Sequence, residues 1–151
     1  MPHPVMFEDN DPYLVRLRRV VLAFPDAEER IAHGRPGFRA GKYFAWYGGS
    51  TKGSADTRVR YDRALIVLPD EADRAALAED ERFFAPAYLA PSGWIGIDLA
   101  AGGTTAPEDV DWQEVAELLD ASYRRIADAR RVALLNELGS PARPPAPPAR
   151  G

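Results

Sequence analysis

Three β-prone segments follow one another between residues 30 and 68, and no helical pattern separates them. They span residues 30–33, 43–47 and 59–68. The links between them are rich in glycine and polar residues, which are typical of turns. Strands joined by such short links pair as antiparallel hairpins, because a parallel pair needs a longer crossover connection. The sequence therefore predicts an antiparallel sheet, in which the second and third segments form an extended hairpin, or wing, around the loop at residues 48–57.

Helical patterns flank these strands on both sides. Asp11, followed by proline, is a predicted N-cap, and apolar residues follow it at helical spacing. Asp70 is placed to begin a short helix, residues 94–99 alternate as a half-buried strand, and Asp111 begins a capping box. The last helical pattern continues after a break into a further helix. The predicted order is α-β-β-β-α-β-α-α, an α+β fold with helices packed beside the antiparallel sheet.

One domain accounts for the 151 residues. We expect a polar leader at residues 1–10, a single domain at residues 11–139 and a proline-rich, disordered tail at residues 140–151. The chain has no cysteine, which excludes cysteine zinc sites, iron–sulfur clusters, thiol catalysis and disulfides, and agrees with a reducing compartment. No apolar run approaches the ~20 residues of a membrane span. We therefore expect a soluble, unexported, cytoplasmic protein with no membrane partner.

Charge is distributed unevenly along the chain. The formal net charge of −4 is opposite in sign to that of most nucleic-acid-binding domains. Residues 30–63, however, hold eight basic and two acidic residues, whereas residues 64–123 hold two basic and thirteen acidic ones. If the basic residues share one face, this segregation predicts a surface that attracts an anionic partner. The alternative is that these charges are simply solvated.

Patterns typical of catalysis and of cofactor binding are missing or incomplete in the sequence. The stretch GGSTKGS at residues 48–54 fails the P-loop pattern, because Lys52 precedes the glycine and a strand follows. His33 is a conceivable general base for Ser122, but no G-x-S-x-G motif surrounds that serine. Two histidines without cysteine are too few for an ordinary zinc site. We therefore expect no metal, no cofactor and no enzyme activity.

Two sets of side chains are candidate binding residues. Basic residues in the strand and wing region can contact phosphates. These candidates are Arg35, Arg39, Lys42, Lys52, Arg58 and Arg60. Aromatic residues between them can stack on bases, although Phe38, Phe44 and Trp46 also suit a core. A cleft for a small ligand or a protein is the alternative function. Its candidate residues are Trp46, Tyr88 and Trp94.

Three separated motifs occur in an order that resembles a known family. They are FPDAEERIAHGRPGFRAGKYFAWY at residues 24–47, PAYL at 86–89 leading to WIGI at 94–97, and LLDASYR at 118–124. Together they resemble the MmcQ/YjbR family, over roughly residues 13–127. The resemblance implies a small α+β fold related to the frataxin-like architecture, described as a double wing, and an assignment as a DNA-binding protein. It implies no set of catalytic residues.

The residues and the resemblance together predict a non-catalytic DNA-binding protein that contacts phosphates through its basic strand and wing region. Phosphate contacts carry little sequence information, so only a slight sequence preference is expected. A small-molecule or protein partner is the alternative to DNA.

Overall fold

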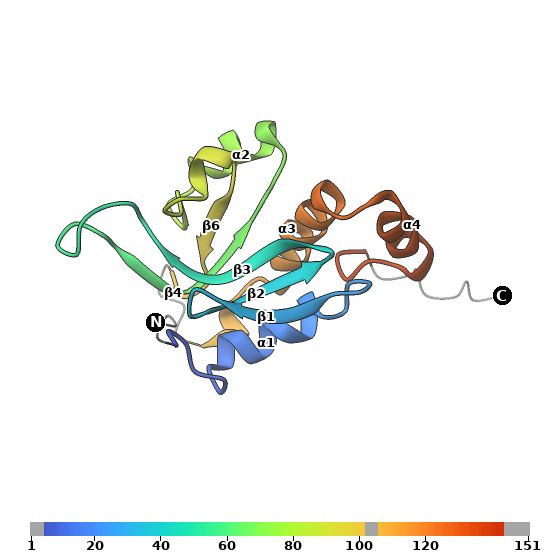
Figure 1. The fold of residues 1–151 in the computed structure, drawn as a ribbon, viewed down its shortest axis with the longest axis horizontal. Helices are drawn as coiled ribbons and strands as arrows, with labels where there is room; N and C mark the ends of the chain where they lie inside the picture. Colours follow the sequence, from blue (N-terminus) through green and yellow to red (C-terminus); the bar gives the residue numbers. More distant parts are fainter. Residues whose placement is uncertain (1–4, 102–105, 144–151) are drawn as a thin grey trace.

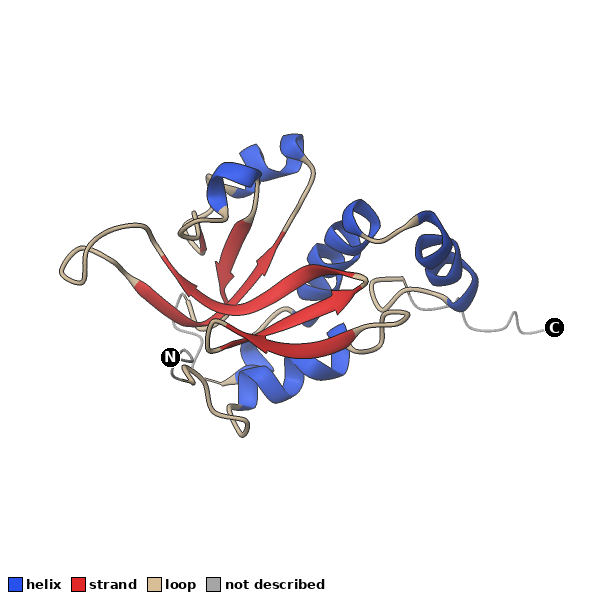
Figure 2. Ribbon diagram, viewed as in Figure 1, coloured by secondary structure: helices blue, strands red, loops and turns tan. Residues whose placement is uncertain are grey.

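The computed structural model describes residues 5–101 and 106–143. Within these residues six strands form one antiparallel sheet, with the spatial order β1-β2-β3-β4-β6-β5. The strands are β1 (Glu28–Ala32), β2 (Arg35–Ala40), β3 (Lys42–Ser50), β4 (Arg60–Val67), β5 (Phe83–Phe84) and β6 (Ile95–Asp98). Figure 2 shows that the helices lie around the sheet and do not interrupt it. The predicted α+β class and antiparallel sheet are therefore confirmed.

The described helices flank the sheet. They are α1 (Pro12–Val21), α2 (Glu71–Leu77), α3 (Trp112–Ile126) and α4 (Ala129–Leu138), with short 3-10 turns η1 (Ala90–Ser92) and η2 (Pro107–Asp109). α1 and α3 pack on one face of the sheet, and the core fills the space between them and the strands (Figure 1). None of the described helices is long and apolar enough to cross a membrane.

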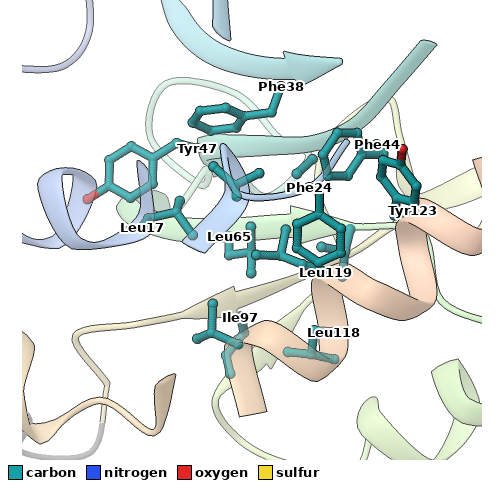
Figure 3. Close-up of a cluster of buried hydrophobic side chains, with 14 of the residues drawn as sticks. Leu17, Phe24, Phe38, Phe44, Tyr47, Leu65, Ile97, Leu118, Leu119 and Tyr123 are labelled. Atoms are coloured by element: carbon teal, nitrogen blue, oxygen red, sulfur yellow. The ribbon is translucent and has the colours of Figure 1, made fainter. Parts of the chain in front are cut away.

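The core joins rings and aliphatic chains from both helices and the central strands. Phe24, Phe44 and Tyr123 form a cluster of rings with centroids 5.1–5.9 Å apart, where β3 meets α3. Leu17 of α1 and Leu119 of α3 are fully buried in the same core (Figure 3). Burial of these apolar chains is the main favourable contribution to folding, at roughly 25 cal/mol per Å² removed from water.

The helix boundaries follow the predicted caps. The Asp11 carboxylate accepts a hydrogen bond from Tyr13 N at 2.9 Å, and Asp111 accepts one from Glu114 N at 3.1 Å. Asp70 precedes α2 as expected, although its side chain makes no capping hydrogen bond. The predicted break in the last helical pattern lies between α3 and α4, where Asp128 starts a new helix by accepting from Arg131 N at 2.9 Å.

The structure contains two strands, β2 and β5, that the sequence pattern does not predict. β2 is hidden in the sequence because Arg35, Pro36 and Gly37 resemble a turn. In the structure Phe38 and Ala40 point into the core, while Gly37 lies on the other face, so the strand alternates as expected. β5 pairs with β6 and has only two residues. A strand this short shows no detectable alternation of apolar and polar residues.

The β3–β4 hairpin extends beyond the rest of the sheet, at the left of Figure 1. Its connecting segment, residues 51–59, is closed by hydrogen bonds from Thr51 N to Val59 O and from Val59 N to Thr51 Oγ1, both 2.9 Å. A turn at its tip is held by Ser54 N donating to Thr57 Oγ1 at 2.9 Å. Residues 48–50 of the predicted polar loop thus belong to β3, and residues 51–59 connect it to β4.

Residues on both sides of the predicted domain limits of 11 and 139 contact the rest of the domain. Met6 N of the predicted leader donates to Gly34 O at 2.8 Å. On the other side of the domain, Ser140 and Ala142 are buried against α3. Gln113 of α3 donates to Ala142 O at 2.8 Å. Residues 140–143 of the predicted tail thus lie against α3, while residues 144–151 lie outside the described residues.

Ser140→Ala is expected to lower the free energy of unfolding by about 1 kcal/mol. The Ser140 hydroxyl donates to Asp120 Oδ2 at 2.5 Å and accepts from Ala142 N, and both bonds are lost in the variant. Urea unfolding measures the change. Ser92→Ala is the matched control, because this exposed serine makes no side-chain hydrogen bond among the described residues. Equal effects of the two substitutions would contradict docking of residues 140–143.

Candidate nucleic-acid interface

A layer of aromatic rings covers the sheet face opposite the core. Trp46 of β3 pairs across the strands with Gly37 and with Ile66. The rings of Tyr43 and Trp46 stack with centroids 4.4 Å apart and planes 21° apart. A Cβ atom on Gly37 would lie 2.6 Å from the Trp46 ring and 2.8 Å from Tyr43. Glycine is required here because both rings lie directly over the backbone of β2.

A second stacked pair lies on the same face. Ile66 pairs with Gly96, and the Phe84 ring lies over Gly96, where an added Cβ would approach to 2.4 Å. Tyr61 stacks on Phe84 with centroids 4.1 Å apart and planes 16° apart. The four rings are half-buried, and Ile66 between the pairs is buried. We call this surface, defined by Tyr43, Trp46, Tyr61, Ile66 and Phe84, the open face.

Arg35, one of the predicted phosphate contacts, has a largely buried side chain that forms an ion pair within the sheet. Its side chain is only 12% exposed, passes over Gly48 of β3 and pairs with Asp62 of β4 at 3.2 Å. Burial lowers the pKa of the Arg35 guanidinium, and the nearby Asp62 carboxylate opposes that shift. Asp62 also binds Arg60 at 2.5 Å. Arg35 therefore connects two strands and presents little charge to solvent.

Arg39 lies at the edge of the open face. It pairs with Glu28 at 3.3 Å, and Arg30 shares the same carboxylate at 3.5 Å. The Arg39 guanidinium also lies over the Tyr43 ring, 5.6 Å from its centroid. In this cluster, as in the one around Asp62, two arginines share one carboxylate. Each cluster therefore keeps a net positive charge.

The other three predicted basic residues are exposed, and in the part of the chain that the structure describes they have no acidic partner. Lys52 and Arg58 both belong to the segment that connects β3 and β4, and this segment forms the end of the hairpin (Figure 1). Lys42 begins β3 at its opposite end, about 25 Å away along the nine-residue strand. The structure thus groups Lys52 with Arg58 and Arg60, and separates Lys42 from them.

The three residues of the predicted aromatic cleft lie on β3, in the loop before η1 and just ahead of β6. Trp46 lies on the open face, and Trp94 is half-buried ahead of β6. Tyr88 is 94% exposed and has a positive φ of 68°. The adjacent Ala87 N donates to Ser50 O at 2.7 Å, which holds this loop beside the base of the hairpin. A cleft for a small ligand or protein at these residues stays a prediction.

An open hollow of about 850 Å³ lies beside the hairpin base, between residues 5–12 and β4. Asp11 is at its wall and accepts a hydrogen bond from the Tyr47 hydroxyl at 2.6 Å. Arg63 lies 3.7 Å from Asp11 and covers the Tyr13 ring. Burial, with this hydrogen bond as the second cause, raises the pKa of the Tyr47 phenol. Tyr47 is therefore a neutral donor at physiological pH, and the network joins α1 to the sheet.

Ser122 has a structural position that does not suit a nucleophile. It is fully buried on α3, donates to Phe44 O at 2.6 Å and accepts from Leu68 N at 2.9 Å. His33 lies in the turn between β1 and β2 with a positive φ of 54°. Among residues 5–101 and 106–143, no group of three histidine, aspartate or glutamate side chains is placed to hold a metal ion.

Sequence reasoning missed the pairing of Tyr61 with Phe84 and the two shared carboxylates. The only signal for the aromatic layer is the placement of Gly37 and Gly96, each opposite a large side chain on the next strand. Glycine in a strand marks a close approach of this kind, but the partner is visible only once the register is known.

Comparison with known proteins agrees with the fold and the motifs. No significant match was found among curated proteins or among solved structures. The model of the family described as YjbR matches residues 22–125, which include the whole sheet and most of α3. That match covers more than half of the chain, and the chain belongs to the YjbR family.

Proposed function

We propose that this protein is a non-catalytic DNA-binding protein, which contacts the phosphate backbone through the tip of the β3–β4 hairpin. One observation carries the proposal. The hairpin extends beyond the sheet, and Lys52 and Arg58 flank the turn at its tip as two exposed cations without an acidic partner among the described residues. Cations in this state attract phosphates because no internal carboxylate has to be displaced.

Arg60 adds a third positive group at the base of the tip. It shares Asp62 with Arg35, so the pair of arginines keeps one positive charge in excess. A hairpin of this length can enter a groove or lie along the backbone, as two-stranded ribbons do in other DNA-binding proteins. Two or three phosphate contacts support weak binding that depends on salt and hardly on sequence.

The proposed phosphate contacts include only three of the six basic residues that the sequence predicts. The side chains of Arg35 and Arg39 are only 12% and 33% exposed, whereas that of Arg60 is 52% exposed although it also pairs with Asp62. Lys42 lies at the far end of β3. We assign phosphate contacts to Lys52, Arg58 and Arg60, and a structural role to Arg35. A location in the cytoplasm and the absence of enzyme activity stay predictions.

The double substitution Lys52→Gln/Arg58→Gln is expected to weaken binding of a fluorescent DNA duplex at least about tenfold at low salt, because two phosphate contacts are lost. Fluorescence anisotropy with the full chain measures the affinity. The matched control is Lys42→Gln/Arg19→Gln, which removes the same charge at two exposed positions away from the tip. Equal losses in both variants, or none in either, would contradict binding by the hairpin.

A further inference from the structure

We infer that the open face is a stacking platform for unpaired bases, so that this protein binds single strands more tightly than duplex DNA. This inference rests on the proposed function and specifies its substrate class. The hairpin tip supplies phosphate contacts, and the open face supplies the contacts to bases. Stacking on aromatic side chains tolerates any base, since every base has a flat π face.

The rings are placed where a ligand can reach them. Tyr43, Trp46, Tyr61 and Phe84 all retain exposed surface, although each has a large aromatic ring. None of them belongs to the buried core, which lies on the other side of the sheet. Gly37 and Gly96 let the rings lie close to the backbone. The open face is therefore a shallow aromatic surface built on a rigid sheet.

The two stacked pairs follow a path across the sheet. Trp46 is on β3, Ile66 on β4, and Phe84 lies over β6, so the pairs are two strand spacings apart, or about 10 Å. Tyr61 lies next to Arg60 in the chain, at the base of the hairpin. A strand whose bases contact these rings would continue directly toward Lys52 and Arg58 at the tip.

Charge around the rings complements a polyanion. Arg39 lies over the Tyr43 ring and Arg30 is beside it, with Glu28 as their shared carboxylate. Arg35 and Arg60 share Asp62 at the other end. Both clusters keep an excess positive charge, and the exposed tip adds two more cations. These arginines add no favourable contact to an apolar protein partner, whereas the excess positive charge at both ends of the rings attracts a phosphodiester chain.

Duplex DNA suits the open face poorly. Its bases are already stacked and paired, so side chains on a flat surface can reach only their edges. Contact with the rings needs bases that are unstacked or free in a single strand. The same hairpin cations remain available to both forms. Preference for single strands therefore reports on the open face, and phosphate binding reports on the tip.

The test compares three probes with the intact protein at low salt. They are an oligo(dT) of about 15 nucleotides, the same strand annealed in a duplex, and an abasic phosphodiester strand of equal length. We expect the oligo(dT) to bind at least about tenfold more tightly than the abasic strand, with quenching of tryptophan fluorescence. Trp46→Leu should abolish most of the quenching and this preference, and Trp46→Phe should restore the preference.

A second variant keeps the inference testable if Trp46→Leu lowers stability. Gly37→Ala retains every ring but displaces the Tyr43 and Trp46 pair, because its Cβ would lie 2.6 Å from the Trp46 ring. It should lose the same preference for bases. Circular dichroism and thermal unfolding of each variant confirm the fold before binding is compared.

The outcomes separate the inference from the proposed function. Equal affinity for oligo(dT), duplex and abasic strand, all reduced by Lys52→Gln/Arg58→Gln, would overturn the base platform and leave the hairpin intact. Base-dependent binding that requires Trp46 but ignores the tip variant would support the platform and overturn the hairpin as the phosphate contact. Absence of binding to all three probes would overturn both.

Discussion

Replacing Asp11 with alanine is expected to lower the free energy of unfolding by about 2–4 kcal/mol. The carboxylate caps α1 through Tyr13 N, accepts the Tyr47 hydroxyl and faces Arg63. Loss of an N-cap costs about 1 kcal/mol, and a buried hydroxyl left without its acceptor costs about 1–3 kcal/mol more. Denaturant unfolding of the variant measures the sum.

Two further variants define what the Asp11 result means. Tyr47→Phe removes the hydroxyl alone and should lower the free energy of unfolding by about 1 kcal/mol. The cost is smaller because the donor itself is removed, so no buried hydroxyl is left without an acceptor. Asp9→Ala is the matched control for loss of an acid, since Asp9 is 86% exposed and its partner Arg18 keeps Glu29. A loss for Asp11→Ala no larger than that for Asp9→Ala would show that the network does not join α1 to the sheet.

Ser122→Ala is expected to lower the free energy of unfolding by about 1–3 kcal/mol. One hydroxyl connects three elements, because it donates to Phe44 O of β3 and accepts from Leu68 N just after β4, while it is carried by α3. Without it, two backbone groups lose their partner at a site that excludes water. Thermal or urea unfolding gives the measurement.

Ser122→Cys separates the hydrogen bonds from packing. The thiol fills a similar volume but is a weak donor and acceptor, so its cost should lie close to that of alanine. Recovery of full stability in the cysteine variant would mean that volume matters here and the hydrogen bonds do not. It would also contradict the structural role that the fold assigns to this serine.

The fold was predictable because its signals are local. Asp11 and Asp111 mark helix starts through their own short-range hydrogen bonds, and the aromatic run of β3 shows its strand character without help from other segments. The sequence does not predict β2 as a strand, because Pro36 and Gly37 resemble a turn. Their strand conformation depends on pairing with β1 and β3. Tertiary pairing decides such segments, and a single sequence does not contain it in readable form.

The candidate site was predictable only as a list of charges. Arg35, Arg58 and Arg60 are the same type of residue in the sequence. In the structure, however, Arg35 packs against Asp62 and Gly48, while Arg58 is exposed. The difference comes from a contact between β2 and β4, 27 positions apart in the chain. The aromatic layer likewise depends on sheet order and register, since Tyr61 of β4 stacks on Phe84 of β5 although β6 lies between these two strands in the sheet.

The salt dependence of DNA binding tests the central claim most directly. Each phosphate contact contributes a slope of about −0.9 to the logarithm of the affinity against the logarithm of salt concentration, so two or three contacts predict a slope of about −2 to −3. In the Lys52→Gln/Arg58→Gln variant the slope should shrink by about 2, whereas Lys42→Gln/Arg19→Gln should leave it unchanged. An unchanged slope in the tip variant, or no binding at about 50 mM salt, would contradict phosphate binding by the β3–β4 hairpin.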